Sequence, residues 1–195
     1  TQVGHLKRLT GSDGVEADYV TNDYGQVTSE RVYSSSSLKS LSPPMNLNGT
    51  YTYDKNGLLK DKRVNAGIGD NSFVNQENYT YDVRNNLQHV AGTHRGGTVY
   101  GYDKNDNLKS VTGPAGKSVS FGYNQRHMLN EVRVGSSDKP EDNTVYGFKY
   151  DGNGNMEQYT APNGAKTYYD YDGYDRLRSV TDPFSNVTRF QRLLN

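Results

Sequence analysis

The chain has 195 residues, of which 32% are apolar and 17 are tyrosine, and its 22 basic residues balance its 22 acidic ones. Disorder on compositional grounds requires a large net charge as well as few apolar residues, so balanced charge argues against it. Balanced charge also argues against a nucleic-acid-binding surface, no stretch is apolar enough to span a bilayer, and the absence of cysteine excludes disulfides and thiolate metal sites. Because tyrosine favours β-strands and has a large apolar body, we expect a tyrosine-rich β structure with many turns.

A short motif built on tyrosine and aspartate recurs along the chain. A weak copy starts at Tyr19, and the clear copies start at Tyr51, Tyr79, Tyr100, Phe121, Phe148 and Tyr169. Three of the steps between these starts are 21 residues long (100 − 79, 121 − 100 and 169 − 148), which sets the base period. Residues 1–18 form a partial unit, and a truncated unit starts at Phe190. We therefore expect a single array over residues 1–195, either a piece of a longer array or an array capped by neighbours.

Each unit is expected to form one β-hairpin. In the unit that starts at Tyr100, Tyr100 and Tyr102 are two residues apart, so both rings lie on one face of a strand. Asp103 then starts a turn, because aspartate bonds the backbone two residues on and tolerates unusual dihedral angles. The Asn- and Gly-rich residues that follow suit hairpin turns with positive φ. The apolar anchors of the second strand, Leu108 and Val111, are three residues apart, which a β-bulge or a first anchor still within the turn would explain.

Several segments lie outside this regular pattern. The serine- and proline-containing segment Val32–Asn48 is expected to be a surface loop. The polar insertions Ala66–Gln76 and Gly135–Asn143 are expected to be longer hairpin or connecting loops. One position in the outer turns is held by proline, where a missing N–H costs no ladder hydrogen bond. These prolines are Pro114, Pro162 and Pro183.

The complete pattern is tyrosine-x-tyrosine-aspartate, then leucine and valine, then T-x-P-x-G, and it is clearest at Tyr100–Gly116 and Tyr169–Pro183. It resembles the YD repeat of Rhs proteins, weakly before Tyr51 and strongly after it. Members include bacterial Rhs polymorphic toxins, the cocoon-forming component of insecticidal toxin complexes, and teneurins. The resemblance implies an all-β fold, a strip of consecutive antiparallel β-hairpins with a period of ~21 residues. In that family the strip forms one curved or spiralling sheet, and here it would be a partial β-shell.

The same resemblance implies a function. The chain would be a non-enzymatic segment of a shell that encloses or presents a C-terminal toxin or effector in a secreted or cell-surface bacterial protein. Its partners would be the rest of the parent shell and the enclosed toxin, since seven units are too few to close a cavity around a folded passenger. The family's self-cleavage motif is of the DPxGL type, whereas Asp182-Pro183 is followed by Phe184-Ser185 in an ordinary repeat position. No protease role is therefore carried over to Asp182.

No catalytic, cofactor-binding or metal-binding residue is expected, and no cofactor. The segments that start at Asp103 and Asp151 resemble the beginning of an EF-hand loop, but Leu108 and Met156 occupy the position that needs glycine. The twelfth position, which needs glutamate, is proline in both segments. His89 and His94 are five residues apart with no carboxylate at ligand spacing nearby, and surface or strand histidines are the default interpretation of all four histidines. These are His5, His89, His94 and His127.

The remaining motifs do not indicate a catalytic site. The glycine-containing segment Gly92–Thr98 lacks the lysine-serine ending of a phosphate-binding loop, and no serine lies in a G-x-S-x-G elbow. Three asparagines head potential glycosylation motifs, which would be used only in a eukaryotic secretory source. They are Asn48, Asn78 and Asn186.

The tyrosine rows allow two interpretations. In the first, the rings stack between neighbouring hairpins and form the core ladder. In the second, some rings stay exposed and, with the Asn/Asp-rich loops, bind a carbohydrate or a partner protein. The two open edges of such a strip are templates for pairing, so we also expect an edge-mediated homodimer or a cap from flanking sequence.

Overall fold

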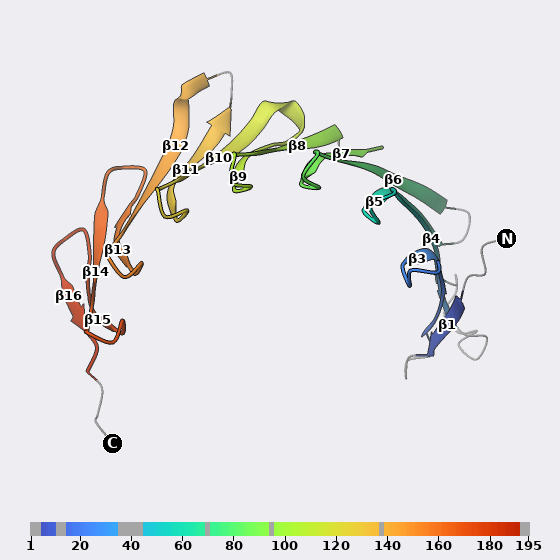
Figure 1. Cartoon of the computed structure of the whole chain (residues 1–195), viewed down its shortest axis with the longest axis horizontal. Helices are drawn as coiled ribbons and strands as arrows, with labels where there is room; N and C mark the ends of the chain where they lie inside the picture. The colour runs from blue at the N-terminus through green and yellow to red at the C-terminus, as the bar shows by residue number, and fades with distance from the viewer. Residues whose placement is uncertain are drawn as a thin grey trace. The chain divides into compact units, whose positions relative to one another are not determined.

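The fold comes from a computed structural model that describes residues 5–10, 15–34, 45–68, 71–93, 96–136 and 139–191. Within these residues there are sixteen β-strands and one 3-10 turn at Pro114–Gly116, and no α-helix. The strands form one open antiparallel sheet in which each strand neighbours those next to it in the sequence (Figure 1). The predicted all-β strip of consecutive hairpins is confirmed.

The chain divides into two compact units, Thr1–Thr98 and Val99–Asn195. The first unit holds the edge strand β1 and three hairpins, β2–β3, β4–β5 and β6–β7. Their bounds are β1 His5–Thr10, β2 Val15–Thr21, β3 Val27–Ser34, β4 Met45–Tyr53, β5 Leu59–Ile68, β6 Asn71–Tyr81 and β7 Leu87–Gly92. Strand β8, Gly96–Tyr102, starts in this unit and ends in the next.

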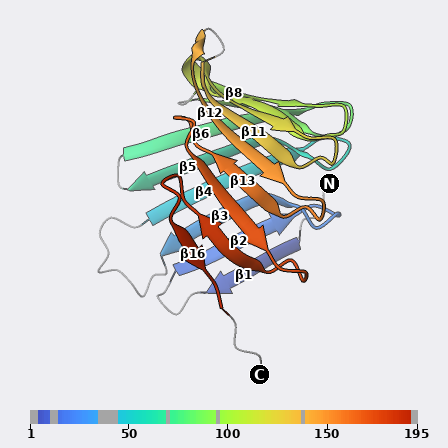
Figure 2. The ribbon, with the colours of Figure 1, turned by 90° about the vertical axis from the view of Figure 1, so that its left-hand side faces the viewer.

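The second unit completes the β8–β9 hairpin and adds three more, β10–β11, β12–β13 and β14–β15, followed by the edge strand β16. The bounds are β9 Leu108–Thr112, β10 Lys117–Tyr123, β11 Leu129–Ser136, β12 Lys139–Tyr150, β13 Met156–Thr160, β14 Lys166–Tyr171, β15 Leu177–Thr181 and β16 Val187–Arg189. Within each unit the strands lie side by side with alternating directions (Figure 2). The short hairpin turns within a unit curl to the same face of the sheet (Figure 1).

A β-bulge explains the odd spacing of the apolar anchors. In the β8–β9 hairpin Tyr102 pairs with Leu108, but Gly101 pairs with Ser110, so Lys109 is an extra residue on the second strand. The extra residue returns Leu108 and Val111 to the same face. The other six hairpins shift register at the same place, one residue before the end of their first strand.

The insertions mostly lengthen strands. Strands β5 and β6 pair from Asp61 with Asn78 to Ile68 with Asn71, so most of the predicted loop at Ala66–Gln76 is ladder. Strands β11 and β12 likewise extend their hairpin to a pair between Ser136 and Lys139. The expected loop at Val32–Asn48 is shorter than predicted, because β3 continues to Ser34 and β4 starts at Met45. The rest of that loop lies outside the described residues.

In five of the seven hairpins, a tyrosine hydroxyl joins the hairpin to the one before it. The backbone ladder between β5 and β6 ends at Asp61 and Asn78, two residues short of the first residue of β5. The hydroxyl of Tyr81, at the end of β6, donates a hydrogen bond of 2.8 Å to the carbonyl of that residue, Leu59. A carbonyl that the bulge leaves without a ladder partner thereby gains a donor.

The same bond recurs four more times. The donors and acceptors are Tyr53 to Val27 (2.7 Å), Tyr123 to Leu108 (2.9 Å), Tyr150 to Leu129 (2.8 Å) and Tyr171 to Met156 (3.1 Å). Burial raises the pKa of Tyr53, Tyr81 and Tyr171, so these phenols stay protonated and able to donate. We call this recurring contact the tyrosine staple.

The sheet is one layer thick and has little core of its own. The chain exposes 13836 Å², whereas a compact globular protein of 21.8 kDa exposes roughly 9,300 Å². Among the described residues Thr21 is buried, with 5% of its surface exposed, but no large apolar side chain is. Apart from the exposed Tyr24, Tyr168 and Tyr174, the tyrosines of the described residues are half-buried. Phe148 and Tyr159 form one of the expected cross-strand aromatic pairs, with ring centres 5.7 Å apart. Hydrogen bonds between hairpins therefore matter more here than in a two-layer protein.

Substituting a staple tyrosine with phenylalanine tests this role. We expect Tyr81→Phe to lower the free energy of unfolding by about 1 kcal/mol, because the ring stays and the Leu59 carbonyl loses its donor. Tyr24→Phe, which removes the hydroxyl of a tyrosine that is 90% exposed, is the matched control. Urea unfolding measures both, and equal stability of the two variants would contradict the staple.

Candidate functional site

The turn at the tip of each hairpin is built on one side chain. In the β8–β9 hairpin the Asp103 Oδ1 atom accepts hydrogen bonds from the backbone N–H of Asn105, at 2.8 Å, and of Asn107, at 3.0 Å. The Asp103 N–H donates to the Asn107 carbonyl, and the Asp106 N–H donates to the Asp103 carbonyl. This is a type I turn with a bulge, held by an aspartate in its first position. The prediction that this aspartate bonds the backbone two residues on is confirmed.

Six further hairpins use the same turn. The capping residues are Asn22, Asp54, Asp82, Asn124, Asp151 and Asp172. The two asparagines show that the turn needs an acceptor oxygen rather than a charge. The outer turn at Asp182 is made the same way, with Pro183 at the position where a type I turn favours proline.

The fourth residue of each turn has a positive φ. Glycine stands there in three turns, as at Gly57 with φ of 79°. Elsewhere the residue is Asn85, Asp106, His127 or Asp175, with φ between 58° and 68°. A non-glycine residue in this region costs about 1–2 kcal/mol, so a compensating contact is expected.

That compensating contact reaches back to the preceding turn. The Asn85 Oδ1 atom accepts a hydrogen bond of 2.9 Å from Asn56 Nδ2 in the turn of β4–β5. The Asp175 Oδ1 atom accepts bonds of 2.8 Å from Asn153 and 2.7 Å from Asn155. His127 Nδ1 lies 3.1 Å from Asn107 Nδ2. Polar side chains therefore link neighbouring turns along the tips of the hairpins.

The calcium-like segments are turns, as the sequence argument indicated. At Asp151 the Oδ1 atom accepts from the N–H groups of Asn153 and Asn155, and Oδ2 accepts from the Asn155 side chain. Hydrogen bonds outweigh desolvation and hold the pKa of Asp103 and Asp151 below the usual range. These carboxylates already have protein donors. Within the described residues no group of three or more His, Asp and Glu could hold a metal ion.

The two histidines whose side chains the structure describes have different structural roles. His89, on β7, packs over Gly97, where an added Cβ would come within 2.4 Å of its Nε2 atom. His127 is a turn residue. Of the other two, His94 lies outside the described residues, and for His5 only the backbone in β1 is described. Two of the possible glycosylation asparagines, Asn78 and Asn186, donate their side-chain amides to Asp61 and Asp182.

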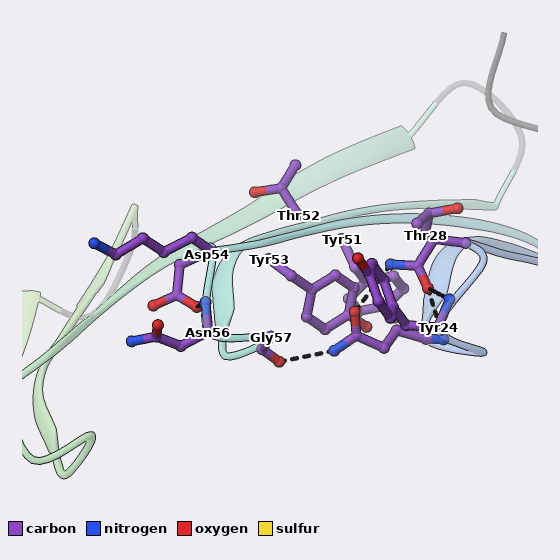
Figure 3. Close-up of a pocket in the computed structure, with 11 residues that line it drawn as sticks. Tyr24, Thr28, Tyr51, Thr52, Tyr53, Asp54, Asn56 and Gly57 are labelled. Carbon is purple, nitrogen blue, oxygen red and sulfur yellow. Dashed lines mark hydrogen bonds between the residues drawn. The ribbon is translucent and has the colours of Figure 1, made fainter.

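The first unit contains a hollow of about 680 Å³ between the turn of β2–β3 and the hairpin β4–β5. Tyr51 and Tyr53 point into it from one face of β4, whereas Thr52 points to the opposite face (Figure 3). Tyr24 stands at its rim and is 90% exposed. Gln26 closes one side by donating a bond of 2.7 Å to the Gly57 carbonyl.

A carboxylate forms part of the same region. The Tyr51 hydroxyl donates a hydrogen bond to the Glu30 carboxylate. Burial is the main cause of the raised pKa of Tyr51, and this hydrogen bond is the second. Gly49 permits the contact, because a Cβ there would lie 2.8 Å from the Glu30 side chain. Aromatic faces beside amides and hydroxyls can stack on and hydrogen-bond a polar ring. Sequence analysis missed this hollow, since it forms only when two hairpins separated by a long loop lie together.

The staple, by contrast, has a signal in the sequence. The first aromatic of a unit is either tyrosine or phenylalanine, as Phe121 and Phe148 show. The second is always tyrosine in the six clear units: Tyr53, Tyr81, Tyr102, Tyr123, Tyr150 and Tyr171. A position that never accepts phenylalanine indicates that its hydroxyl has a partner.

Comparison with known proteins supports the repeat. Residues 102–139 match the family model described as RHS Repeat, so the predicted resemblance to YD repeats is confirmed there. The match contains the complete β10–β11 hairpin and the outer turn before it. No curated protein matches the chain.

Solved structures similar to this chain include TcdB2-TccC3-TEV, TcdB2-TccC3-Cdc42 and TcdB2-TccC3, with TM-scores of 0.44, 0.43 and 0.43. In each comparison the identity is 12%, and the match covers 90% of this chain. This chain spans 13% of the length of those chains.

The turn carboxylates predict how acid affects stability. A side-chain bond from Arg176, aided by the Tyr174 and Arg176 N–H groups, lowers the pKa of Asp172 to about 2. A carboxylate with a lowered folded-state pKa stabilises the fold above its unfolded pKa, near 3.8, and this is lost as the pH falls towards 2. Asp172→Asn keeps the acceptor oxygen, as Asn124 does, but removes the charge.

We therefore expect Asp172→Asn to lose less stability than the unchanged chain between pH ~4 and pH ~2. Urea midpoints measured across this range give the comparison. Asp23→Asn, which removes the same charge from a turn tip, is the control and should follow the unchanged chain. Parallel pH curves for all three would show that the Asp172 cap is not ionised in the way described.

Proposed function

We propose that this chain is a non-enzymatic segment of a YD-repeat shell, one array over residues 1–195. The shell would enclose or present a C-terminal toxin or effector in a secreted or cell-surface bacterial Rhs-like protein. The RHS Repeat match at 102–139 supports this proposal. So does the sheet order, in which every hairpin extends the same sheet.

The observation that carries the proposal is the single layer. A wall needs two accessible faces and continuous lateral bonding, and here the tyrosine staples and linked turns supply bonding without a second layer of structure. The absence of large buried apolar side chains from the described residues fits a wall better than an independent globular domain.

The polar groups also suit a structural role. The side-chain oxygens of the turn aspartates accept bonds from the backbone of their own turn. A carboxylate held this way is a poor general base, because its lone pairs are already engaged. In the described residues no helix is long and apolar enough to cross a membrane.

The parent protein provides the test. If the repeats form a wall around a passenger, limited proteolysis of the full-length parent should leave the domain after the repeats intact. Combined Tyr81→Phe and Tyr150→Phe substitutions should speed its digestion, because two staples are lost. Combined Tyr24→Phe and Tyr174→Phe substitutions, at exposed turn tips, should not. A passenger cleaved as fast in the unchanged parent as in isolation would refute the proposal.

A second candidate function is carbohydrate binding at the hollow beside Tyr24, Tyr51 and Tyr53. The observation in its favour is an aromatic floor and a 90% exposed tyrosine beside the amide of Gln26. Sugar rings stack on aromatic faces and bond to amides and hydroxyls.

Glycan-array binding separates this candidate from the wall. We expect Tyr24→Ala to abolish any specific glycan signal by removing the stacking ring. Tyr174→Ala removes an equally placed tyrosine, 81% exposed, that lies outside the hollow, and should leave the signal unchanged. No signal from the unchanged chain, or equal loss in both variants, would exclude the hollow as a glycan site.

A further inference from the structure

Two units place a charged residue where the others place an apolar one. Eleven residues after its opening aromatic, each unit from Tyr79 onwards has a valine or a tyrosine, and these residues are half-buried. The unit that starts at Tyr19 has Glu30 at this position, and the unit that starts at Tyr51 has Lys62. Both of these residues are half-buried as well. A charge in such a place needs a partner that compensates for the water it has lost.

Among the described residues, one of the two charges has an ionic partner and the other does not. The Nζ atom of Lys62 lies 3.6 Å from the Glu77 carboxylate. Glu30 accepts a hydrogen bond from the Tyr51 hydroxyl, but no lysine, arginine or histidine of the described part of the chain forms an ion pair with it. The repeat therefore leaves a carboxylate without a cation directly behind Tyr51, which lines the hollow.

The hydroxyl groups of the hollow can accept hydrogen bonds but have no proton left to donate. Thr28 and Tyr53 each donate to a backbone carbonyl, and Tyr51 donates to Glu30. A hydroxyl has one proton and two lone pairs, so these three oxygens keep only their capacity to accept. A hydroxyl that donates to a carboxylate is polarised by it, which makes the Tyr51 oxygen the strongest of the three acceptors.

The amides and rings of the hollow have the same character. Asn22 donates a hydrogen bond of 2.9 Å to the side chain of Gln26, and Gln26 donates one of 2.7 Å to the Gly57 carbonyl. Tyr51 and Tyr53 add their rings to the wall (Figure 3). The face of an aromatic ring is electron-rich and attracts cations. The wall therefore offers mainly lone pairs and ring faces to a ligand.

The charges around the hollow favour a positive ligand. Asp54 and Lys55 are the charged residues that line it, and their charges cancel. Glu30, behind Tyr51, leaves the region with a net negative charge. A cationic group that donates hydrogen bonds is complementary to this wall, because it meets acceptors, ring faces and a carboxylate at once.

We propose that the hollow prefers sugars that carry a protonated amino group, such as glucosamine units, to neutral or acidic sugars. The proposal rests on the carbohydrate site described above and names the class of sugar that it takes. The sugar ring stacks on Tyr24, which is 90% exposed at the rim. The ammonium group donates to the hydroxyl oxygens of the wall, and Glu30 supplies the opposite charge. An acidic sugar would instead set its own lone pairs against those of the wall.

Isothermal titration calorimetry of the unchanged chain tests this preference with three linear tetramers, of glucosamine, of N-acetylglucosamine and of glucose. Acetylation keeps the sugar ring but removes the positive charge and two of the amino protons. We expect the glucosamine tetramer to bind roughly tenfold more tightly than the other two. Added salt should reduce this advantage, because it screens the attraction between charges.

Three variants locate the source of the preference. Glu30→Gln keeps an acceptor oxygen for Tyr51 but removes the charge, so the glucosamine tetramer should bind only as tightly as the neutral tetramers, whose affinity stays the same. Glu157→Gln removes an equal charge beside a smaller hollow of about 330 Å³ in the second unit, and this matched control should keep the preference. Lys55→Gln removes the competing cation and should strengthen binding of the glucosamine tetramer.

The possible outcomes separate this proposal from the carbohydrate site on which it rests. Equal or tighter binding of the N-acetylglucosamine or glucose tetramer would overturn the preference and leave the carbohydrate site in place. If none of the three tetramers binds, both the preference and the site are refuted. A preference that survives Glu30→Gln, disappears in Glu157→Gln or weakens in Lys55→Gln would show that the cation is attracted elsewhere on the chain, which would also overturn the proposal.

Discussion

The structure depends on a hydrogen bond between a tyrosine hydroxyl and a carbonyl in the preceding hairpin. The bulge that begins each second strand returns the apolar anchors to one face, but it also ends the ladder to the next hairpin early. The carbonyl left there, as at Leu59, accepts from the tyrosine that ends the following strand. A repeat thus leaves one carbonyl oxygen without a ladder partner, and in five hairpins a tyrosine hydroxyl of the next repeat donates the missing hydrogen bond.

This arrangement explains how a one-layer sheet holds together. Isolated hairpins are marginal in water, and within each unit the described residues form no second layer of strands or helices that would add burial. Neighbouring hairpins are instead joined by backbone ladder at the outer part of the strands, as between β5 and β6. The staple adds a bond near the tip in five hairpins, and polar contacts such as Asn56 with Asn85 link several of the turns. Stability in such an array comes largely from contacts between neighbours.

The same arrangement leaves few polar side chains available for catalysis. Asp103 and Asp151, which in the sequence resemble the start of calcium-binding loops, are engaged by their own turns. Groups that remain available lie at turn tips, as Tyr24 does. The glycan site proposed above would use such a group, in the hollow beside Tyr24.

Much of the fold follows from the sequence, because a period of 21 residues places the same strand and turn residues in every unit. Tyr100, Tyr102 and Asp103 predict strand, face and turn correctly since those properties are local. The choice between a bulge and a displaced anchor at Leu108 could not be made, because it depends on pairing with the opposite strand. The strand portions of Val32–Asn48 were missed for the same reason, as polar residues there are held by the β3–β4 ladder.

The central claim is that the staple joins neighbouring hairpins, and amide hydrogen exchange measures this directly. In Tyr150→Phe we predict faster amide exchange around the tip of the preceding β10–β11 hairpin, where Leu129 loses its donor. The β2–β3 hairpin in the other unit should be unchanged. Faster exchange confined to the variant's own β12–β13 hairpin would contradict the account, because the tyrosine would then act only within its own repeat.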